Sequence, residues 1–145
     1  MKIRYVSGWL AIAAVIGIGH SVLRAQPTGS QQSVKDGVYT EVQAQRGRDL
    51  IIKIGCANCH GDTLEGGPGE VPPLVGTAFL SDWEGQTLRD LANQISSMPP
   101  DSGAKRSLQE NVDIMTLLLQ INGYPAGKNE LPADQAVLGQ IKIAQ

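Results

Sequence analysis

The stretch Cys56-Ala57-Asn58-Cys59-His60 decides how the rest of this sequence is interpreted. At helical spacing, two cysteines three positions apart lie on one face, so both sulfurs can reach the two vinyl groups of one haem. The histidine that follows can then ligate the iron, and Cys-x-x-Cys-His is the spacing of covalent haem attachment. The sequence therefore predicts one haem c, bound through Cys56 and Cys59, with His60 as an iron ligand.

Two other kinds of site share the Cys-x-x-Cys spacing. Structural zinc usually requires four ligands from two such pairs, and this chain has only two cysteines. A thioredoxin-like dithiol normally follows a strand in a strand-helix-strand unit, and no such alternation surrounds Cys56. His20 lies in the expected leader, which leaves His60 as the only histidine of the mature chain. Haem attachment is therefore favoured over zinc binding and over a redox dithiol.

Residues 1–25 are predicted to be a secretory signal. Lys2 and Arg4 precede an apolar run from Val6 to Ile18, and the small residue Ala25 offers a cleavage site. The run is short and contains glycines, so a cleaved signal is favoured over an uncleaved membrane anchor. We expect an exported protein whose mature chain starts at Gln26.

The composition of the mature chain limits its organisation and its partners. Its 120 residues suffice for one domain and not for two. Without the three basic residues of the leader, nine basic residues stand against fourteen acidic ones, a net charge of minus five. No basic stripe with stacking aromatics is present, so we expect no binding to nucleic acid. No serine triad, acid–base pair or phosphate-binding loop is evident, so the chain is not expected to be an enzyme on its own.

Apolar residues at helical spacing predict an all-α chain. Thr40 can cap a first helix, and Thr87 with Asp90 and Ser107 with Glu110 form capping boxes that begin two more. The expected helices cover residues 40–54, 87–95, 107–121 and, more briefly, 135–143. The positions expected to be buried on the first three are Val42, Leu50, Ile51, Ile54, Leu88, Leu91, Ala92, Ile95, Val112, Met115, Leu118 and Leu119.

The segments between these helices are rich in residues that interrupt regular structure. Residues 26–38 lack an apolar period and are expected to form a flexible lead-in. The glycines and prolines of residues 66–73 predict a loop that wraps around another part of the molecule. Asn122-Gly123 ends the third helix. Gly47 costs a helix about 1 kcal/mol relative to alanine, so it either allows another backbone to approach or is a tolerated surface glycine.

The second iron ligand is expected to be a methionine, because the mature chain has no other histidine. Met115 lies within an apolar helical stripe, where it is expected to fill the core. Met98 follows a helix in an irregular segment and precedes Pro99 and Pro100, which restrict the backbone. Met98 is therefore the predicted sixth ligand, and histidine with methionine gives a higher reduction potential than two histidines.

In order, Gly47, the Cys56–His60 motif, Pro72-Pro73-Leu74-Val75-Gly76 and Met98-Pro99 resemble class I monohaem c-type cytochromes. The resemblance covers roughly residues 40–125. It implies that residues 39–127 form a cytochrome c-like bundle of about four to five short helices around one covalent haem, followed by a 128–145 tail with a short helix. It also implies that the Pro72 carbonyl accepts a hydrogen bond from His60 and that Gly47 contacts the last helix near residues 117–121. An aromatic residue often stands in this family where this chain has Leu117.

A second set of motifs is similar to small cytochromes that partner pyrroloquinoline-quinone dehydrogenases. These motifs are Phe79-Leu80-Ser81-Asp82-Trp83, Met98-Pro99-Pro100, Asn122–Gly127 and Leu131–Asp134. The resemblance implies a periplasmic electron carrier that accepts electrons from an alcohol, aldehyde or sugar dehydrogenase and passes them to another cytochrome or an oxidase. In it, Trp83 either donates its indole N–H to a haem propionate or only fills the core.

Alternative functions stay open at the level of sequence. A haem enzyme or gas-binding sensor would need an open or labile sixth position on the iron. A haem subunit that assembles a membrane complex would retain the apolar run from Val6 to Ile18 as an anchor. Lys53, Lys105 and Arg106 are near the haem motif or Met98 in sequence and are candidate contacts to a redox partner, or are simply solvated.

Overall fold

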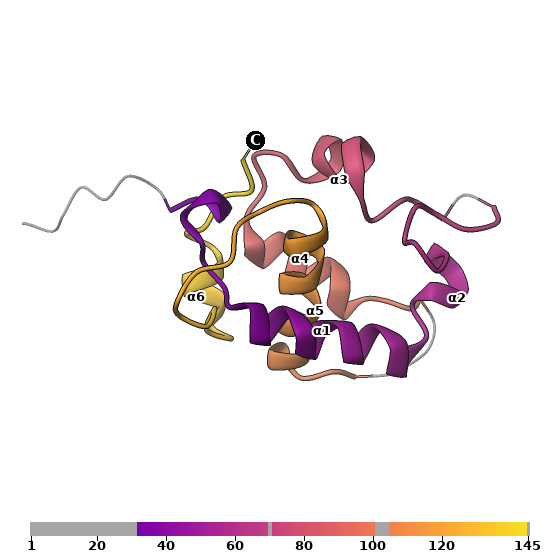
Figure 1. The fold of residues 1–145 in the computed structure, drawn as a ribbon, viewed down its shortest axis with the longest axis horizontal. Coiled ribbons are helices and arrows are strands. Elements are labelled where there is room, and N and C mark those ends of the chain that lie inside the picture. Colours follow the sequence, from indigo (N-terminus) through magenta and orange to yellow (C-terminus); the bar gives the residue numbers. More distant parts are fainter. Residues whose placement is uncertain (1–31, 70, 101–104, 145) are drawn as a thin grey trace, which may run out of the picture.

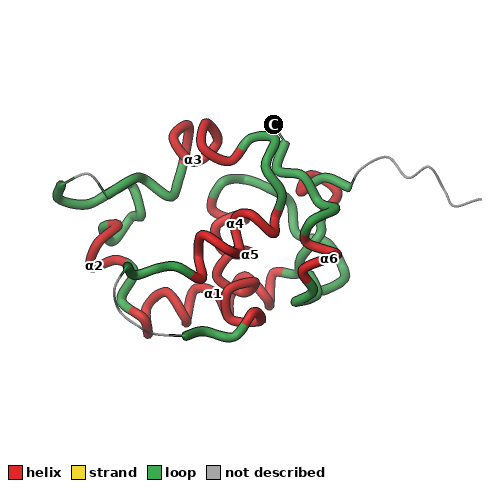
Figure 2. Tube along the Cα trace, turned by 180° about the vertical axis from the view of Figure 1, so that it is seen from behind, coloured by secondary structure: helices red, strands yellow, loops and turns green. Residues whose placement is uncertain are grey.

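The computed structural model describes residues 32–69, 71–100 and 105–144. These residues form helices joined by loops and contain no β-strand, as Figures 1 and 2 show, which confirms the predicted helical class. The expected leader and the first part of the lead-in lie outside the described residues. The elements are η1 (Val34–Asp36, a 3-10 turn), α1 (Glu41–Ile54), α2 (Ala57–His60), α3 (Gly76–Trp83), α4 (Leu88–Ser96), α5 (Leu108–Ile121) and α6 (Gln135–Leu138).

Helix α1 begins and ends as the sequence predicts, but one of its expected core positions is wrong. The Thr40 hydroxyl accepts a hydrogen bond from Gln43 N, and Gly55 ends the helix in the left-handed region at φ 80°. Gly47 and Ile51 are buried, whereas Val42 is 66% exposed. At 100° per residue, Val42 points almost opposite to the buried face, which Gln43 helps to form instead.

Gly47 is the point of closest approach between α1 and α5. A Cβ atom at this position would lie 2.0 Å from the carbonyl oxygen of Asp113 and 3.1 Å from Cβ of Leu117. No side chain fits at such distances without separating the two helices. The expected contact between the first and last long helices is therefore present: it includes Leu117, as predicted, and its closest atom belongs to Asp113, one turn earlier along α5.

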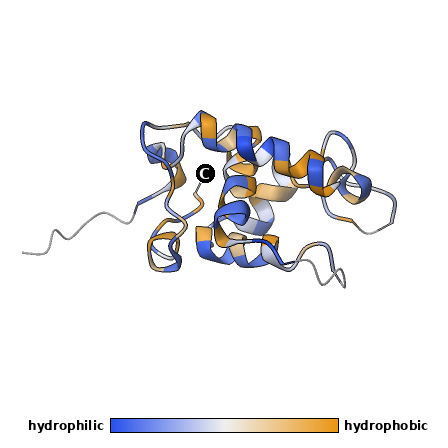
Figure 3. Ribbon diagram, turned by 90° about the horizontal axis from the view of Figure 1, so that it is seen from below, coloured by the Kyte–Doolittle hydropathy of each residue, from blue (hydrophilic) through white to orange (hydrophobic). Residues whose placement is uncertain are grey.

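Helices α4 and α5 match their predictions closely. In both capping boxes, the hydroxyl accepts from the third residue of the helix and that residue's carboxylate accepts from the capping N–H. Leu88, Leu91, Ala92 and Ile95 are buried on α4, and all four expected positions on α5 are buried. The amphipathic pattern is visible in Figure 3, where hydrophilic and hydrophobic residues alternate along the helices.

Two helices differ from the sequence prediction. Helix α3 was not predicted, because it has eight residues, begins at a glycine with φ 73° and has no side-chain cap. Helix α6 is capped by Asp134 but ends at Leu138, well short of residue 143. Ile141 and Ile143 continue as non-helical chain and are almost fully buried, so their apolar character reflects core packing rather than helix. The described part of residues 39–127 thus contains five α-helices, within the four to five expected, and α6 is the short helix expected in the tail.

The second half of the expected lead-in is packed, which corrects the prediction of a flexible segment up to residue 38. Val34 is fully buried, and its N–H donates to the carbonyl of Lys142 at 3.0 Å. Lys142 N donates in turn to the carbonyl of Gln32 at 2.9 Å. Isolated buried valines have no periodicity, so the sequence pattern gave no sign of this contact with the C-terminal segment.

The molecule has two parts: the closely packed helices with the C-terminal segment, and the region formed by the loops that follow α1 and α4. In Figure 1, α1 runs along one edge from the α6 end to α2, and α4 and α5 lie beside it. The C-terminal segment meets α1 at Leu131, whose carbonyl accepts from Gln43. Further on, Ile141 and Ile143 form main-chain hydrogen bonds with Leu88 and Gln86 at the start of α4. Within the described ranges, every helix falls short of the length and apolar character that a membrane crossing requires.

Candidate functional site

A cavity of about 760 Å³ lies between the helices and the loops that follow α1 and α4. Its volume is within the range of roughly 300–1,000 Å³ that is usual for small-molecule and cofactor sites. The walls are mainly apolar, and Asp82 and Arg106 supply the charged side chains. All six residues predicted for the site line it: Cys56, Cys59, His60, Pro72, Trp83 and Met98.

The two cysteines lie on the short turn that α2 forms after α1 ends. Gly55 reverses the chain at φ 80°, and Cys56 then stands at the start of α2 with Cys59 one turn later. Both are free thiols; Cys56 is half-buried and Cys59 is exposed. Burial raises the pKa of the Cys56 thiol. A redox dithiol of the thioredoxin type has the opposite shift, a lowered pKa at the first cysteine.

His60 is oriented by the main chain of Pro72. Its Nδ1 atom lies 3.0 Å from the carbonyl oxygen of Pro72, the contact that the sequence resemblance implies. A carbonyl can only accept, so Nδ1 donates and Nε2 keeps its lone pair for a metal. Such a hydrogen bond fixes both the tautomer and the plane of the ring.

The glycine-rich loop after α2 wraps closely around that helix. A Cβ atom on Gly67 would lie 1.7 Å from the carbonyl oxygen of Cys59, so only glycine fits there. Gly66 N donates to the carbonyl of His60 at 3.0 Å, and Leu74 N donates to that of Leu64 at 2.8 Å. The loop thereby returns the chain to the cavity, where Pro72 meets His60.

Asn122 ties this same loop to the end of α5. Its side-chain nitrogen donates to the carbonyls of Leu74 at 3.0 Å and Leu118 at 2.8 Å, and its oxygen accepts from Gly76 N at 2.9 Å. The sequence identified Asn122 only as a helix stop. Leu74 and Gly76 are distant from Asn122 in sequence, so no local pattern could have revealed its contact with this loop.

Met98 lies far from the Cys56–His60 motif in sequence, just after α4, and lines the same cavity. It is half-buried, and its N–H donates to the carbonyl of Ile95 at 3.1 Å. Met115 is fully buried within α5 and packs with the core. The structure therefore separates the two methionines as the sequence predicts, with Met98 at the cavity and Met115 in the core.

Trp83 and Phe79 form an aromatic wall where α3 meets the cavity. Their ring centroids are 6.4 Å apart at an interplanar angle of 38°. Phe79 is buried, whereas Trp83 is half-buried and lines the cavity together with Asp82. This position is compatible with both roles proposed for Trp83, core packing and contact with a bound group.

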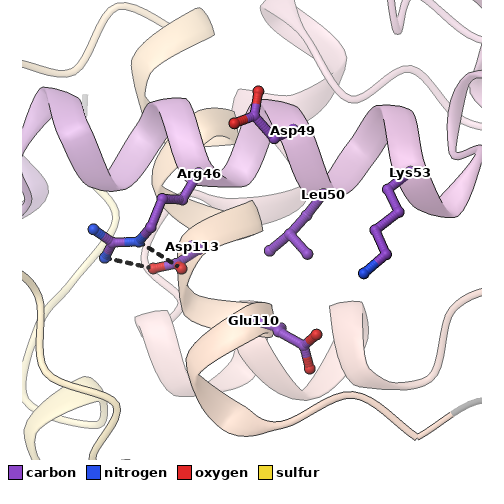
Figure 4. A pocket seen from close by; sticks show the side chains of 6 residues that line it. All are labelled: Arg46, Asp49, Leu50, Lys53, Glu110 and Asp113. Carbon is purple, nitrogen blue, oxygen red and sulfur yellow. Dashed lines mark hydrogen bonds and ion pairs between the residues drawn. The ribbon is translucent and has the colours of Figure 1, made fainter.

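A second, smaller hollow of about 300 Å³ lies on the outer surface between α1 and α5 and contains none of the predicted site residues. Figure 4 shows that it is lined mainly by charged side chains, with Arg46 directed at Asp113. Arg46 Nε donates to Asp113 Oδ2 at 3.0 Å, and its Nη1 donates to Glu130 Oε1 at 2.8 Å. Lys53 lines this hollow and not the large cavity, so it lies away from the candidate site.

The residues around the large cavity fit a covalently bound haem. Apolar walls suit a macrocycle, two thiols stand one turn apart, and an imidazole and a thioether share the space. Across the described part of the chain, no three histidine, cysteine or acidic side chains gather into a group that could hold a metal ion alone.

Comparisons with models of protein families, with curated proteins and with solved structures find no match to this chain. The interpretation of the cavity therefore rests on the residues that line it.

Proposed function

We propose that the chain is a one-electron carrier that holds a single haem c, in the manner of class I c-type cytochromes. The observation that carries this proposal is that Met98 lines the same cavity as Cys56, Cys59 and His60. The sequence selected these residues by different arguments, the cysteines and histidine by spacing and the methionine by its proline-rich context. Their convergence in one apolar cavity supports a common ligand.

Each side chain has a defined role in the proposed site. The thiols of Cys56 and Cys59 would hold the haem covalently through its vinyl groups, and His60 Nε2 and the Met98 sulfur would ligate the iron. A bound haem supplies an iron that gains or loses one electron. The Pro72 carbonyl holds His60 in the tautomer that ligates, and the apolar walls exclude water. With His60 and Met98 both available as iron ligands, the site would favour electron transfer over binding of a substrate.

The direct test is expression of the full chain in a bacterial host that carries out haem c maturation. We expect the exported product to gain the mass of one haem and to keep its colour after extraction with acidified acetone. Cys56→Ala with Cys59→Ala should remove the covalent haem. A wild-type product that has the mass of the bare polypeptide would refute the proposal.

Met98→Ala tests the sixth ligand against the alternative of an open iron site. The variant should lose the far-red methionine-to-iron absorption band and should bind carbon monoxide when reduced. Met115→Leu is the matched control, because it replaces the buried methionine at similar volume and should leave the band unchanged. Carbon monoxide binding by the reduced wild-type protein would instead favour a haem enzyme or gas sensor.

We further propose that the protein works in the periplasm beside a quinoprotein dehydrogenase that oxidises an alcohol, aldehyde or sugar. The support is the leader-like start of the sequence and the motifs at residues 79–83, 98–100 and 122–134. A purified dehydrogenase of this class, given its substrate, should reduce the oxidised protein in stopped-flow mixing. Sequencing the N-terminus of the exported protein will show whether the segment from Val6 to Ile18 is removed.

A further inference from the structure

Arg106 stands at a position in the cavity wall that the proposed function does not explain. It is half-buried, it follows the Met98 segment and it precedes the capping residue of α5. The sequence suggested it as a contact to a redox partner. Its hydrogen bonds are directed inward instead.

The guanidinium of Arg106 joins α5 to the end of α4. Its Nη2 donates to the main-chain carbonyls of Ile95 and Met98, and its Nε donates to Asn111 Oδ1 at 3.1 Å. Asn111 is only 3% exposed, so the anchor on α5 lies within the core. The Ile95 carbonyl belongs to the last turn of α4, where a cation is favoured by the helix dipole.

These contacts fix the backbone of Met98 from two directions. The N–H of Met98 donates to Ile95, and its carbonyl accepts from Arg106. An arginine is suited to this task because its planar fork can donate to several acceptors at once, whereas the ammonium group of lysine cannot reproduce that geometry. The Met98 backbone is thereby held where its side chain lines the cavity.

We infer that Arg106 is the positioning residue for the sixth ligand: it holds the Met98 segment so that the thioether remains on the haem iron. This inference rests on the proposed haem site. It adds the residue that keeps Met98 bound as the sixth ligand. Loss of Arg106 should leave the haem attached but make the bond from Met98 to iron labile.

The test compares Arg106→Gln with Arg106→Lys in the haem-loaded protein, with Lys105→Gln as the control for loss of a neighbouring exposed charge. The readouts are the methionine-to-iron band and the affinity of the oxidised protein for imidazole. We expect Arg106→Gln to weaken the band and bind imidazole at least tenfold more tightly, Arg106→Lys to fall between it and wild type, and Lys105→Gln to match wild type.

A double variant separates positioning from general destabilisation. When Met98 is already alanine, adding Arg106→Gln should not change imidazole affinity further, because no ligand remains to be held. An undiminished band and unchanged imidazole affinity in Arg106→Gln would overturn the inference, as would an equal change in the Met98→Ala background. If Arg106→Gln does not fold, wild-type behaviour of Arg106→Lys overturns it. Absence of the band in the wild-type protein would instead refute Met98 ligation itself.

Discussion

The two parts of this molecule are stabilised in different ways. Where α1, α5 and the C-terminal segment meet, helices touch through Gly47 and the apolar side chains are almost fully buried. Around the cavity, Ile54, Leu74 and Trp83 are only partly buried. The packed part thus buries its apolar surface against the chain itself, whereas the other part presents apolar surface to the cavity.

Polar side chains serve these two parts differently. In the packed part, the buried side chain of Gln43 donates to the carbonyl of Leu131 and accepts from its N–H, both at 2.9 Å. Around the cavity, Pro72, Asn122 and Arg106 hold loops whose positions matter for ligands. We expect changes in the first part to alter stability and changes in the second to alter the spectrum of the bound haem.

The largest loss of stability is expected from Gly47→Val. The new side chain would meet the Asp113 carbonyl, so α1 and α5 must separate, at a cost of about 3 kcal/mol or more in the free energy of unfolding. Denaturant titration measures this cost. Gly139→Ala is the control, because its Cβ would meet only the movable end of the Arg89 side chain and should change stability little. Equal stability of Gly47→Val and wild type would contradict the close packing.

The next largest loss of stability is expected from Gln43→Ala, which should lower the free energy of unfolding by about 2–3 kcal/mol. It leaves the buried N–H and carbonyl of Leu131 without their partner, and each unsatisfied group costs on the order of 1–3 kcal/mol. Hydrogen exchange at Leu131 should accelerate. Gln45→Ala, on the exposed side of the same helix, should have little effect. The haem spectrum should stay unchanged in both variants, and a shifted spectrum in Gln43→Ala would show that the two parts are not independent.

Asn122→Ala should lower the free energy of unfolding by about 1–2 kcal/mol. It should affect the cavity more than the core. Three hydrogen bonds to Leu74, Gly76 and Leu118 are lost, which frees the loop that carries Pro72. We expect a higher reduction potential or a shifted Soret band, because a less firmly held His60 loses basicity that its hydrogen bond to Pro72 supplies. Asn93→Ala, an exposed asparagine on α4, is the control. An unchanged spectrum and potential would remove Asn122 from the support of the site.

The smallest expected effect on stability is its pH dependence at the capping box of α4. Hydrogen bonds from Thr87 lower the pKa of Asp90 from its ordinary value of 3.8. The ionised carboxylate therefore stabilises the capping box above that pH, and this contribution is lost as the pH falls below it. Asp90→Asn should cost below about 1 kcal/mol at neutral pH, and its difference from wild type should shrink towards pH 2. A difference that grows in acid would have the wrong sign for this mechanism.

The sequence was most informative where local rules decide the structure. Both capping boxes, the buried face of α4, the close contact at Gly47 and the hydrogen bond between His60 and Pro72 follow predictions. Each depends either on a short pattern or on a motif with a defined geometry. The placement of Met98 at the cavity also follows from its local context.

The sequence was least informative where contacts join distant segments. Val42 was expected to be buried because it is apolar, yet the polar Gln43 is buried, since it satisfies the backbone of Leu131. Arg106 and Asn122 likewise act on carbonyls far from them in sequence. Side chains that serve backbone groups of another segment leave no periodic signal, so only the folded arrangement reveals them.

The pairing of Lys142 with Gln32 and Val34 makes the two ends of the described core immediate neighbours. A short linker could therefore join them, and a new start could be opened in the exposed stretch at Lys128-Asn129, giving a circular permutant with the same core. Fluorophores placed on the two neighbouring ends would move apart on unfolding, and so would report the integrity of the fold independently of any colour from haem.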